Sequence, residues 1–523
     1  MSNNKQGGNT IVNKHLDTTQ KENNGGAFNK FLNVVEKIGN KLPHPFMLFL
    51  YLTLILVAIS FILGSMNASV VHPNTGETVT VNNLLSKEGI RYILGNTLSN
   101  FTGFAPLGLV LTMMLGIGLS EKVGLFSALM TKAITKTPKR IVSFMVVFIG
   151  ILGNIASDAA FVVIPPLAAL VFLSLGRHPL AGLAAGLAGA GIGFTANILI
   201  AGTDALLSGI STEVMKTIDP SIMVSPLDNW FFMSVSTFLL AFLGAFVTDK
   251  IVEPRLGKYN GDKKADLHDL SPLENRALRN TGIAALLYMA VIVTLLLIPN
   301  SPLLNDDGTI LRSPFLSGIV PLLFGLFVTT GITYGVSVKE IKSAADVPNI
   351  MAEAIKDLSG YIVLIFIIGQ FIGYFNWTNI ATWMAVNLAS LLEAINLTNV
   401  FAIVLFTLLV AILSLFIISG SALWSLVAPI FVPTFYLLDY HPALVQLAYR
   451  VGESSTNMVT PLNPYFAIIL GFVLIYNKKA GIGTLMSLMI PYTIVFLIAW
   501  ILLMLAFVFF NIPIGPGVHY YLN

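Results

Sequence analysis

The sequence predicts an all-α polytopic membrane protein made of inverted repeats, each carrying a re-entrant helical hairpin. Of the 523 residues, 55% are hydrophobic and 11% are charged, whereas a soluble domain has about 25% charged residues. Apolar stretches long enough to cross a bilayer recur through the chain. Other apolar stretches are short and interrupted by prolines and polar residues, and similar interruptions occur in both halves.

The net charge of +3 and the absence of cysteine limit the classes of function to consider, because a chain without cysteine has neither disulfides nor thiolate chemistry. Basic residues concentrate in loops, as the positive-inside rule predicts, so we expect a lipid bilayer and no nucleic acid as partner. The chain has no phosphate-binding glycine loop with lysine, no HExxH, and no GxSxG at the start of a helix. We therefore expect no enzyme activity, no cofactor and no metal centre, with an ion gradient as the energy source.

The N-terminal region leads into the first spans. Residues 1–27 are polar and rich in Asn, Gly and Lys, which predicts a disordered tail. The block 28–120 opens with apolar residues at helical spacing, which predict an interfacial helix, with a loose basic tail as the alternative. Residues 47–63 and 102–120 are predicted spans. The polar stretch 68–100 between them is predicted to be an outside loop, which places the N-terminus in the cytoplasm.

The block 121–252 is the predicted first repeat. A hairpin is predicted at about 154–176, because the apolar arm after the motif GNIASDAAFVVIPP is too short for the ~20 residues of a span. Small residues fill 180–203 and permit close helix packing. The polar interruption Thr195–Asn197 predicts a helix that is unwound in its middle, and a clean span follows at 229–248.

Two blocks separate the repeats, and a short tail ends the chain. The strongly basic loop 253–280 is predicted to be cytoplasmic. Residues 281–357 are predicted to contain outer spans and a helix along the inner surface. Residues 511–523 are the C-terminal tail.

The block 358–510 is the predicted second repeat. Residues 358–392 carry no charge and are long enough for two spans broken near Asn376. Residues 400–418 are predicted to be a further span, and a second hairpin is expected at about 420–438. Unpaired backbone and charges at this depth persist only where they face protein or a water-filled cavity, so the sequence from this hairpin onward predicts a site.

The two halves contain the same polar residues and prolines in the same order, displaced by about 260 to 264 residues. The matched pairs are Ser157 and Ser421, Pro165 and Pro429, His178 and His441, Pro179 and Pro442, Thr195 and Thr456, and Asn197 and Asn457. Such paired, broken apolar segments are typical of secondary transporters with repeated halves. Arg140 is predicted to lie on the cytoplasmic side before the first hairpin, and one more crossing precedes the second hairpin, which favours inverted repeats.

The second repeat contains two candidate site charges, Arg450 and Glu453, which lie three residues apart and are able to pair on one helix face. One interpretation is a purely structural ion pair. In the other, the planar guanidinium binds an anionic substrate and Glu453 couples transport to a proton.

Further candidates have a structural alternative. Asp204 either lines the cavity or caps a helix, and Asp158 either caps a helix or binds a cation or proton. Asp439 fits a solvated turn. Trp424 is interpreted either as a core or interfacial residue or as a stacking surface for an aromatic substrate.

Short polar side chains near the helix breaks form a third group of candidates. Ser421, Asn457 and Asn197 are able to coordinate a substrate or to satisfy freed backbone groups. The matched positions of the two asparagines favour the site, and a sodium ion near them is left open.

The chain resembles the AbgT family, the aminobenzoyl-glutamate transporters, over almost everything beyond the polar tail. The resemblance rests on KLPHP, GNIASDAAFVVIPP, GFTAN with GTDALLSGI, SALWSLVAPIFVP and, most specifically, YRVGESSTNMVTPLNPYF. It implies a homodimer with about nine transmembrane helices and two re-entrant hairpins per protomer, in the inner (cytoplasmic) membrane of a bacterium. It also implies uptake of p-aminobenzoyl-glutamate, or export of p-aminobenzoate and sulfonamide antimetabolites, driven by the proton-motive force.

By motif, the resemblance places substrate-lining positions at Asp204, Ser421, Trp424, Pro442, Arg450 and Glu453. An arginine for a carboxylate and a tryptophan for an aromatic ring suit a small aromatic carboxylate. Glu453 departs from the aspartate of the family pattern, and its extra methylene changes where the carboxylate lies. A sodium-coupled carboxylate or peptide-like anion symporter is the alternative function, and a channel is the remote one.

Overall fold

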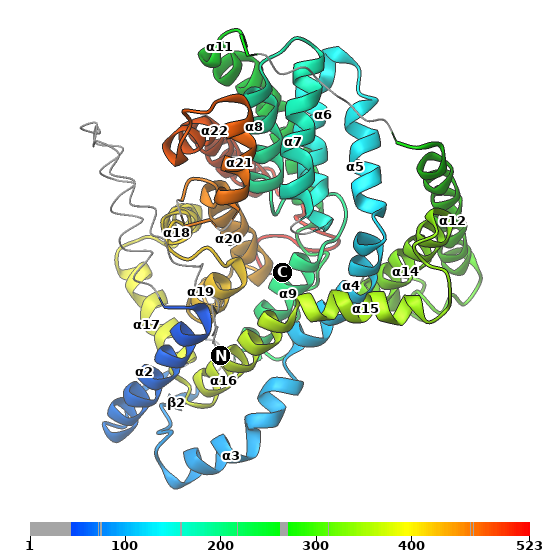
Figure 1. Ribbon diagram of the computed structural model, residues 1–523. Coiled ribbons are helices and arrows are strands. Elements are labelled where there is room, and N and C mark those ends of the chain that lie inside the picture. Colours follow the sequence, from blue (N-terminus) through cyan, green and yellow to red (C-terminus); the bar gives the residue numbers. More distant parts are fainter. Residues whose placement is uncertain are drawn as a thin grey trace, which may run out of the picture.

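The computed structural model describes residues 43–71, 73, 76–156, 159–216, 218–261, 270–311, 313–460, 462–463 and 465–522 (Figure 1). The predicted tail 1–27, the predicted interfacial helix after it, and Asp158 lie outside the described residues. Eight helices of the described chain are long and apolar enough to cross a membrane. Six shorter apolar helices accompany them, and most of these belong to hairpins or broken helices.

The first spans differ from the prediction in the connection between them. The elements are α2 (Pro45–Ser65), β1 (Ser69–Val71), β2 (Thr78–Thr80), α3 (Lys87–Thr102), α4 (Ala105–Lys122) and α5 (Leu125–Thr135). The stretch predicted to be an outside loop thus contains an antiparallel strand pair, with Val70 opposite Val79, and a 16-residue helix. This helix begins at Ser86, whose hydroxyl accepts the Gly89 N–H at 3.0 Å.

The first repeat contains a hairpin and a broken helix, as predicted. Its elements are η1 (Lys139–Ile141), α6 (Val142–Gly153), η2 (Asn154–Ala156), α7 (Ala159–Ser174), α8 (Pro179–Leu187), the π-helical η3 (Ala188–Ile192), α9 (Gly202–Met215), α10 (Trp230–Val247), η4 (Thr248–Val252) and α11 (Glu253–Leu256). The backbone between η3 and α9 is not helical, so the GFTAN segment is the unwound part. Gly189 permits close packing there, since a Cβ would lie 2.4 Å from the Val147 carbonyl oxygen.

The second repeat corrects one predicted span. Its elements are α16 (Ser359–Trp377), α17 (Ile380–Ala394), α18 (Val400–Leu413), α19 (Gly420–Tyr436), α20 (Pro442–Thr456), α21 (Phe466–Tyr476) and α22 (Ile482–Phe509). At 14 residues, α18 is about 21 Å long, too short for a hydrocarbon core of about 30 Å. The stretch 400–418 is therefore the first arm of the second hairpin, and α19 is the second arm.

The two repeats use the same device to start the helix after each hairpin. The His178 Nδ1 accepts the Leu180 N–H at 3.2 Å, and the His441 Nδ1 accepts the Ala443 N–H at 3.1 Å. A proline stands at the first position of both helices, where its missing N–H costs nothing. The matched His-Pro pairs therefore mark the starts of equivalent helices, α8 and α20.

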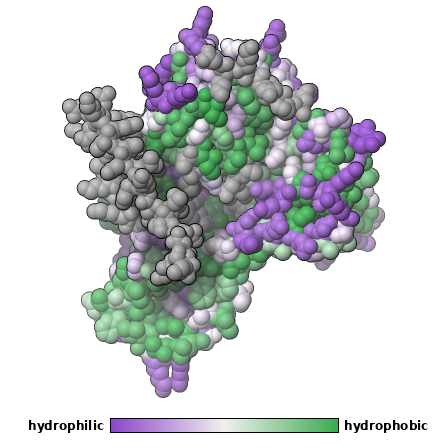
Figure 2. Space-filling model, viewed as in Figure 1, coloured by the Kyte–Doolittle hydropathy of each residue, from purple (hydrophilic) through white to green (hydrophobic). Residues whose placement is uncertain are grey.

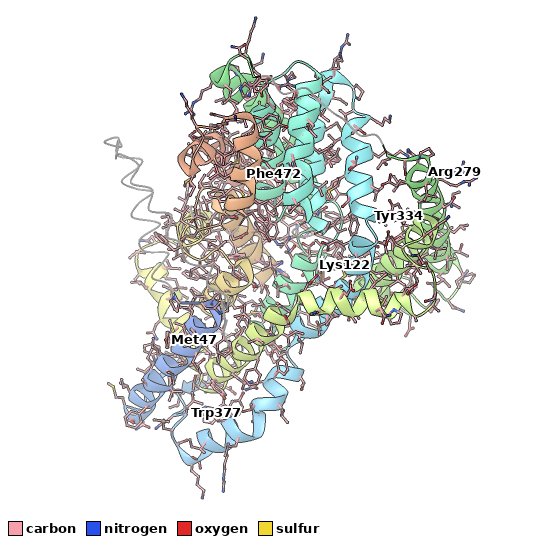
Figure 3. The ribbon with its side chains drawn as sticks, in the orientation of Figure 1. Met47, Lys122, Arg279, Tyr334, Trp377 and Phe472 are labelled. Atoms are coloured by element: carbon pink, nitrogen blue, oxygen red, sulfur yellow. The ribbon has the colours of Figure 1, made fainter. Side chains whose placement is uncertain are left out.

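The remaining elements form an arm that packs against α4. They are α12 (Pro272–Leu297), α13 (Pro314–Ser317), α14 (Ile319–Val338) and α15 (Asp346–Asp357). Figure 1 shows α12 and α14 side by side at the right, α2, α3, α16 and α17 at the lower left, and α6, α7, α8 and α21 at the top. In Figure 3, Arg279 and Tyr334 mark the right arm, Phe472 the upper body, and Met47 and Trp377 the lower left.

The surface agrees with a membrane position. Figure 2 shows hydrophilic side chains gathered at the upper and lower extremities and over α15, with hydrophobic side chains between them. The side chains of Leu286 and Leu297 on α12 are 72% and 79% exposed. Such apolar exposure is costly in water and favourable in lipid.

Candidate functional site

The site is organised around α20. All fifteen residues of this helix are buried, although they include an arginine, a glutamate and several hydroxyls. Gly452 makes this packing possible, because a Cβ there would lie 2.3 Å from the Thr407 carbonyl oxygen of α18. Burying ionised groups costs free energy unless they are paired, so the partners of these side chains define the site.

Arg450 pairs with the first repeat and not with Glu453. Its Nη1 lies 2.6 Å from the Asp204 Oδ1, and no ion pair joins Arg450 to Glu453 in the described chain. The other Asp204 oxygen accepts the Ala201 N–H at 2.6 Å, so Asp204 also caps α9. The predicted pairing three residues along α20 is thus wrong, because a carboxylate from the facing repeat reaches the guanidinium instead.

The Arg450 guanidinium has hydrogen-bond donors that no described residue uses. The Arg450 side chain is 1% exposed, and its Nε and Nη2 have no hydrogen-bond partner among the described residues. The Nη1 contact with Asp204 is an ion pair whose angle falls short of a hydrogen bond. A buried guanidinium with unused donors is the group that an anion's oxygens satisfy best.

The unwound segment of the first repeat binds directly to α20. The Thr195 N–H donates to the Ser454 Oγ at 3.1 Å, and the Thr195 hydroxyl donates to the Arg450 carbonyl oxygen at 3.4 Å. The Thr456 hydroxyl donates to the Ala411 carbonyl oxygen at the end of α18, at 2.8 Å. Hydroxyls of the second repeat therefore satisfy backbone freed by the helix breaks.

The tip of the second hairpin is held by an aromatic pair. The Tyr449 hydroxyl donates to the Gly420 carbonyl oxygen at 2.5 Å, and the Tyr449 and Trp424 rings lie 4.6 Å apart. The Trp424 Nε1 donates to the Leu207 carbonyl oxygen at 3.1 Å, and the residue is 0% exposed. Trp424 thus packs in the core between α19 and α9, away from the cavity wall.

A cavity of about 760 Å³ lies beside these groups. Its lining residues come from the start of α2, from α7, from both helix breaks and from the tip of the second hairpin. They are Pro43, His44, Pro45, Leu48, Phe161, Phe194, Phe416, Ile417, Ile418, Ser419, Gly420, Glu453, Asn457, Met458, Leu462, Asn463 and Tyr465. Glu453 is 3% exposed and accepts no hydrogen bond from any residue that the structure describes.

Of the remaining predicted residues that the structure describes, Asn457 lines this cavity, whereas Asn197, Ser421 and Pro442 do not. The Asn457 Oδ1 has no partner in the described chain. The Asn197 Oδ1 already accepts the Leu199 N–H at 3.0 Å, which leaves its Nδ2, a donor, unpaired. Ser421 exchanges a hydrogen bond with Ser419 at 3.2 Å, and Pro442 is the first residue of α20.

Sequence reasoning missed the aromatic wall of the cavity. Phe161 on α7 and Tyr465 before α21 stack with ring centroids 4.6 Å apart and planes inclined by 3°. Phe194 and Phe416 line the same space. All four lie within a few residues of a hairpin tip or a helix break, and that adjacency was the available signal.

The comparisons with known proteins agree with this architecture. Residues 30–522 match the sequence profile of the AbgT putative transporter family. The chain belongs to this family. It is 45% identical over 487 residues to the p-aminobenzoyl-glutamate transport protein of Escherichia coli strain K12, covering 93% of this chain and 96% of that protein. This AbgT family member is therefore a multi-pass membrane transporter and not an enzyme.

Two solved structures of this kind share the fold. The YdaH transporter of Alcanivorax borkumensis superposes with a TM-score of 0.87 at 38% identity, over 91% of this chain and all of that one. MtrF of Neisseria gonorrhoeae, described as one of a class of antimetabolite efflux pumps, superposes with a TM-score of 0.88 at 43% identity, over 93% of this chain and all of that one.

Proposed function

We propose that the protein is a secondary active transporter of p-aminobenzoyl-glutamate or p-aminobenzoate-type aromatic carboxylates, with sulfonamide antimetabolites as further exported ligands and a proton gradient as the energy source. The observation that carries the proposal is Arg450, a fully buried guanidinium with two unused nitrogens, one helical turn from a carboxylate that lines the cavity. The named activities of the relatives support the same ligand class.

Each charge has a distinct role in this proposal. Arg450 binds the substrate carboxylate, and the carboxylate competes with Asp204 for the guanidinium. Glu453 carries the coupling proton, because it is buried, lines the cavity and has no hydrogen-bond partner in the described chain. In this proposal, transport proceeds when the Arg450–Asp204 ion pair between the two repeats gives way to contacts with the substrate.

The setting is the inner membrane of a bacterium, with the N-terminus in the cytoplasm and two chains forming a homodimer. The charge distribution supports the orientation, since the strongly basic loop 253–280, which includes Lys258, is predicted to lie inside. Size-exclusion chromatography with light scattering in detergent tests the dimer. A protein mass equal to one chain would contradict it.

Sodium coupling is the second candidate. The unpartnered Asn457 Oδ1 favours it, because an amide oxygen is a suitable ligand for a hard cation.

The deciding experiment is flux in proteoliposomes. Labelled p-aminobenzoyl-glutamate and p-aminobenzoate are followed while pH and sodium gradients are imposed independently. We expect accumulation that saturates with substrate and depends on the pH gradient alone. Accumulation driven only by sodium contradicts proton coupling, and flux that never saturates favours a channel.

A further inference from the structure

The cavity wall is rich in hydrogen-bond acceptors and poor in positive charge. Glu453 and Asn457 line it, neither Glu453 nor the buried Asn457 Oδ1 has a partner in the described chain, and no lysine or arginine is among its lining residues. Its one imidazole, His44, is exposed, and the His44 Nδ1 accepts the Phe46 N–H at 3.3 Å. A ligand carboxylate in this space would face another carboxylate, whereas a ligand N–H would satisfy an unpaired acceptor.

The same cavity carries the aromatic surface. The stacked pair Phe161 and Tyr465 joins the two repeats across the cavity, and Phe194 and Phe416 add further aromatic wall. Trp424 cannot serve this purpose in the same geometry, since it is fully buried, packs against Tyr449 with ring planes inclined by 39°, and donates its Nε1–H to the Leu207 carbonyl oxygen. A flat, ring-bearing ligand thus finds its complementary surface at the Phe161–Tyr465 pair.

We propose that this cavity is an arylamine subsite. The ligand ring packs against Phe161 and Tyr465, its amino group donates to Glu453 and Asn457, and its carboxylate end points toward Arg450. The inference rests on the proposed function. It adds the orientation of the substrate and two residues, Phe161 and Tyr465, that determine specificity for the ring. It also explains why one helix carries an anion-binding arginine and an unpaired carboxylate three residues apart.

The test separates ring recognition from carboxylate recognition. Equilibrium binding to the full-length protein in proteoliposomes is measured for p-aminobenzoyl-glutamate and for N-acetyl-glutamate, which keeps the carboxylates and lacks the ring. Phe161→Leu and Tyr465→Leu are each expected to weaken binding of the ring-bearing probe about two- to tenfold, as loss of an aromatic contact does. Binding of N-acetyl-glutamate should change less than twofold.

A matched control removes an aromatic pair elsewhere. Phe366 lies 5.5 Å from Phe101 in a T-shaped pair outside the cavity lining, and Phe366→Leu should leave both affinities unchanged. If Tyr465→Leu does not insert, Phe161→Leu decides alone. Unchanged binding of the ring-bearing probe to inserted Phe161→Leu overturns the ring assignment while leaving the proposed function intact.

The proposed role of the ligand's amino group is tested by comparing ligands with and without it. The wild-type protein is expected to prefer p-aminobenzoate to benzoate, and Glu453→Gln should reduce that preference about tenfold through loss of a charge-assisted hydrogen bond. Equal affinity of the wild type for the two acids overturns the amine assignment. A wild type that neither binds nor transports any of these acids contradicts the proposed function itself.

Discussion

At the scale of single residues, the two buried charges of α20 are in opposite situations. Arg450 is neutralised by Asp204 from the other repeat, whereas Glu453 faces the cavity without a partner in the described chain. Removing one member of a buried pair leaves the other uncompensated, and this costs about 3 to 5 kcal/mol. The effects of the Arg450–Asp204 pair on stability and on transport can therefore be separated by replacing one member of the pair or both.

We predict that Arg450→Ala and Asp204→Asn each abolish transport and lower the free energy of unfolding by about 3 to 5 kcal/mol. The double variant Arg450→Met with Asp204→Leu should regain most of that stability, because apolar residues replace a buried pair well. It should remain inactive. Thermal unfolding in detergent and flux in proteoliposomes measure the two effects, and an active double variant would show that the pair is only structural.

Glu453→Gln should uncouple transport from the pH gradient. The amide keeps the size of the side chain and cannot bind or release the proton, so accumulation is lost while exchange of labelled for unlabelled substrate continues. Glu453→Asp restores the residue of the family pattern and serves as the control, with coupling retained. Proton-driven accumulation by Glu453→Gln would assign coupling to another group.

At the scale of elements, short helices and breaks create the site. The arms α18 and α19 end in a tip between Ser414 and Gly420, and the non-helical segment before α9 places Thr195 against α20. Both features persist because hydroxyls of α20 satisfy the freed backbone groups: the Ser454 Oγ accepts from the Thr195 N–H of the facing repeat, and the Thr456 hydroxyl donates to the Ala411 carbonyl oxygen of α18.

Tyr449→Phe is predicted to loosen the tip of the second hairpin. The change removes the hydroxyl that binds the Gly420 carbonyl oxygen, so opening of the tip should become about two- to tenfold more frequent. The chain has no cysteine, and Ile418→Cys therefore gives a single thiol at the cavity wall. Its rate of reaction with a water-soluble maleimide should rise in the Tyr449→Phe background.

A matched substitution provides the control for this measurement. The Tyr361 hydroxyl donates to the Pro106 carbonyl oxygen at 3.0 Å, away from the hairpin. Tyr361→Phe should leave the labelling rate at Ile418→Cys unchanged. The same rate in all three backgrounds would mean that Tyr449 does not hold the tip.

At the scale of the whole molecule, charge and apolar surface fix the position in the bilayer. The arm of α12 and α14 exposes apolar side chains, whereas the repeats bury theirs around α20 (Figures 1 and 2). The strongly basic connection 253–280 is expected on the cytoplasmic side, as the positive-inside rule predicts.

Single cysteines with a membrane-impermeant reagent test this orientation. In intact cells, Asn67→Cys and Asp306→Cys should be labelled from outside, since they follow the outward ends of α2 and α12. Lys258→Cys and Lys479→Cys should be labelled only after the cells are opened. Labelling of Lys258→Cys in intact cells would reverse the topology.

Much of the fold could be predicted from the sequence. Lack of charge identified the spans, because an ionised group that faces hydrocarbon costs free energy. The matched His-Pro pairs located helix starts, because a cap and a proline act within a few residues. The stretch 400–418 was misread as a span because hydropathy does not distinguish a hairpin arm from a crossing.

The stretch from Gly420 onward shows where prediction from the sequence ended. The sequence by itself determined that Arg450 and Glu453 are buried charges in need of partners. Only the tertiary structure decided that Asp204 pairs with Arg450, that Trp424 is sealed in the core, and that Phe161 meets Tyr465 at the cavity. The physical reason is that burial and charge are properties of a residue in its local sequence, whereas a partner some 250 residues away is chosen by how the two repeats pack.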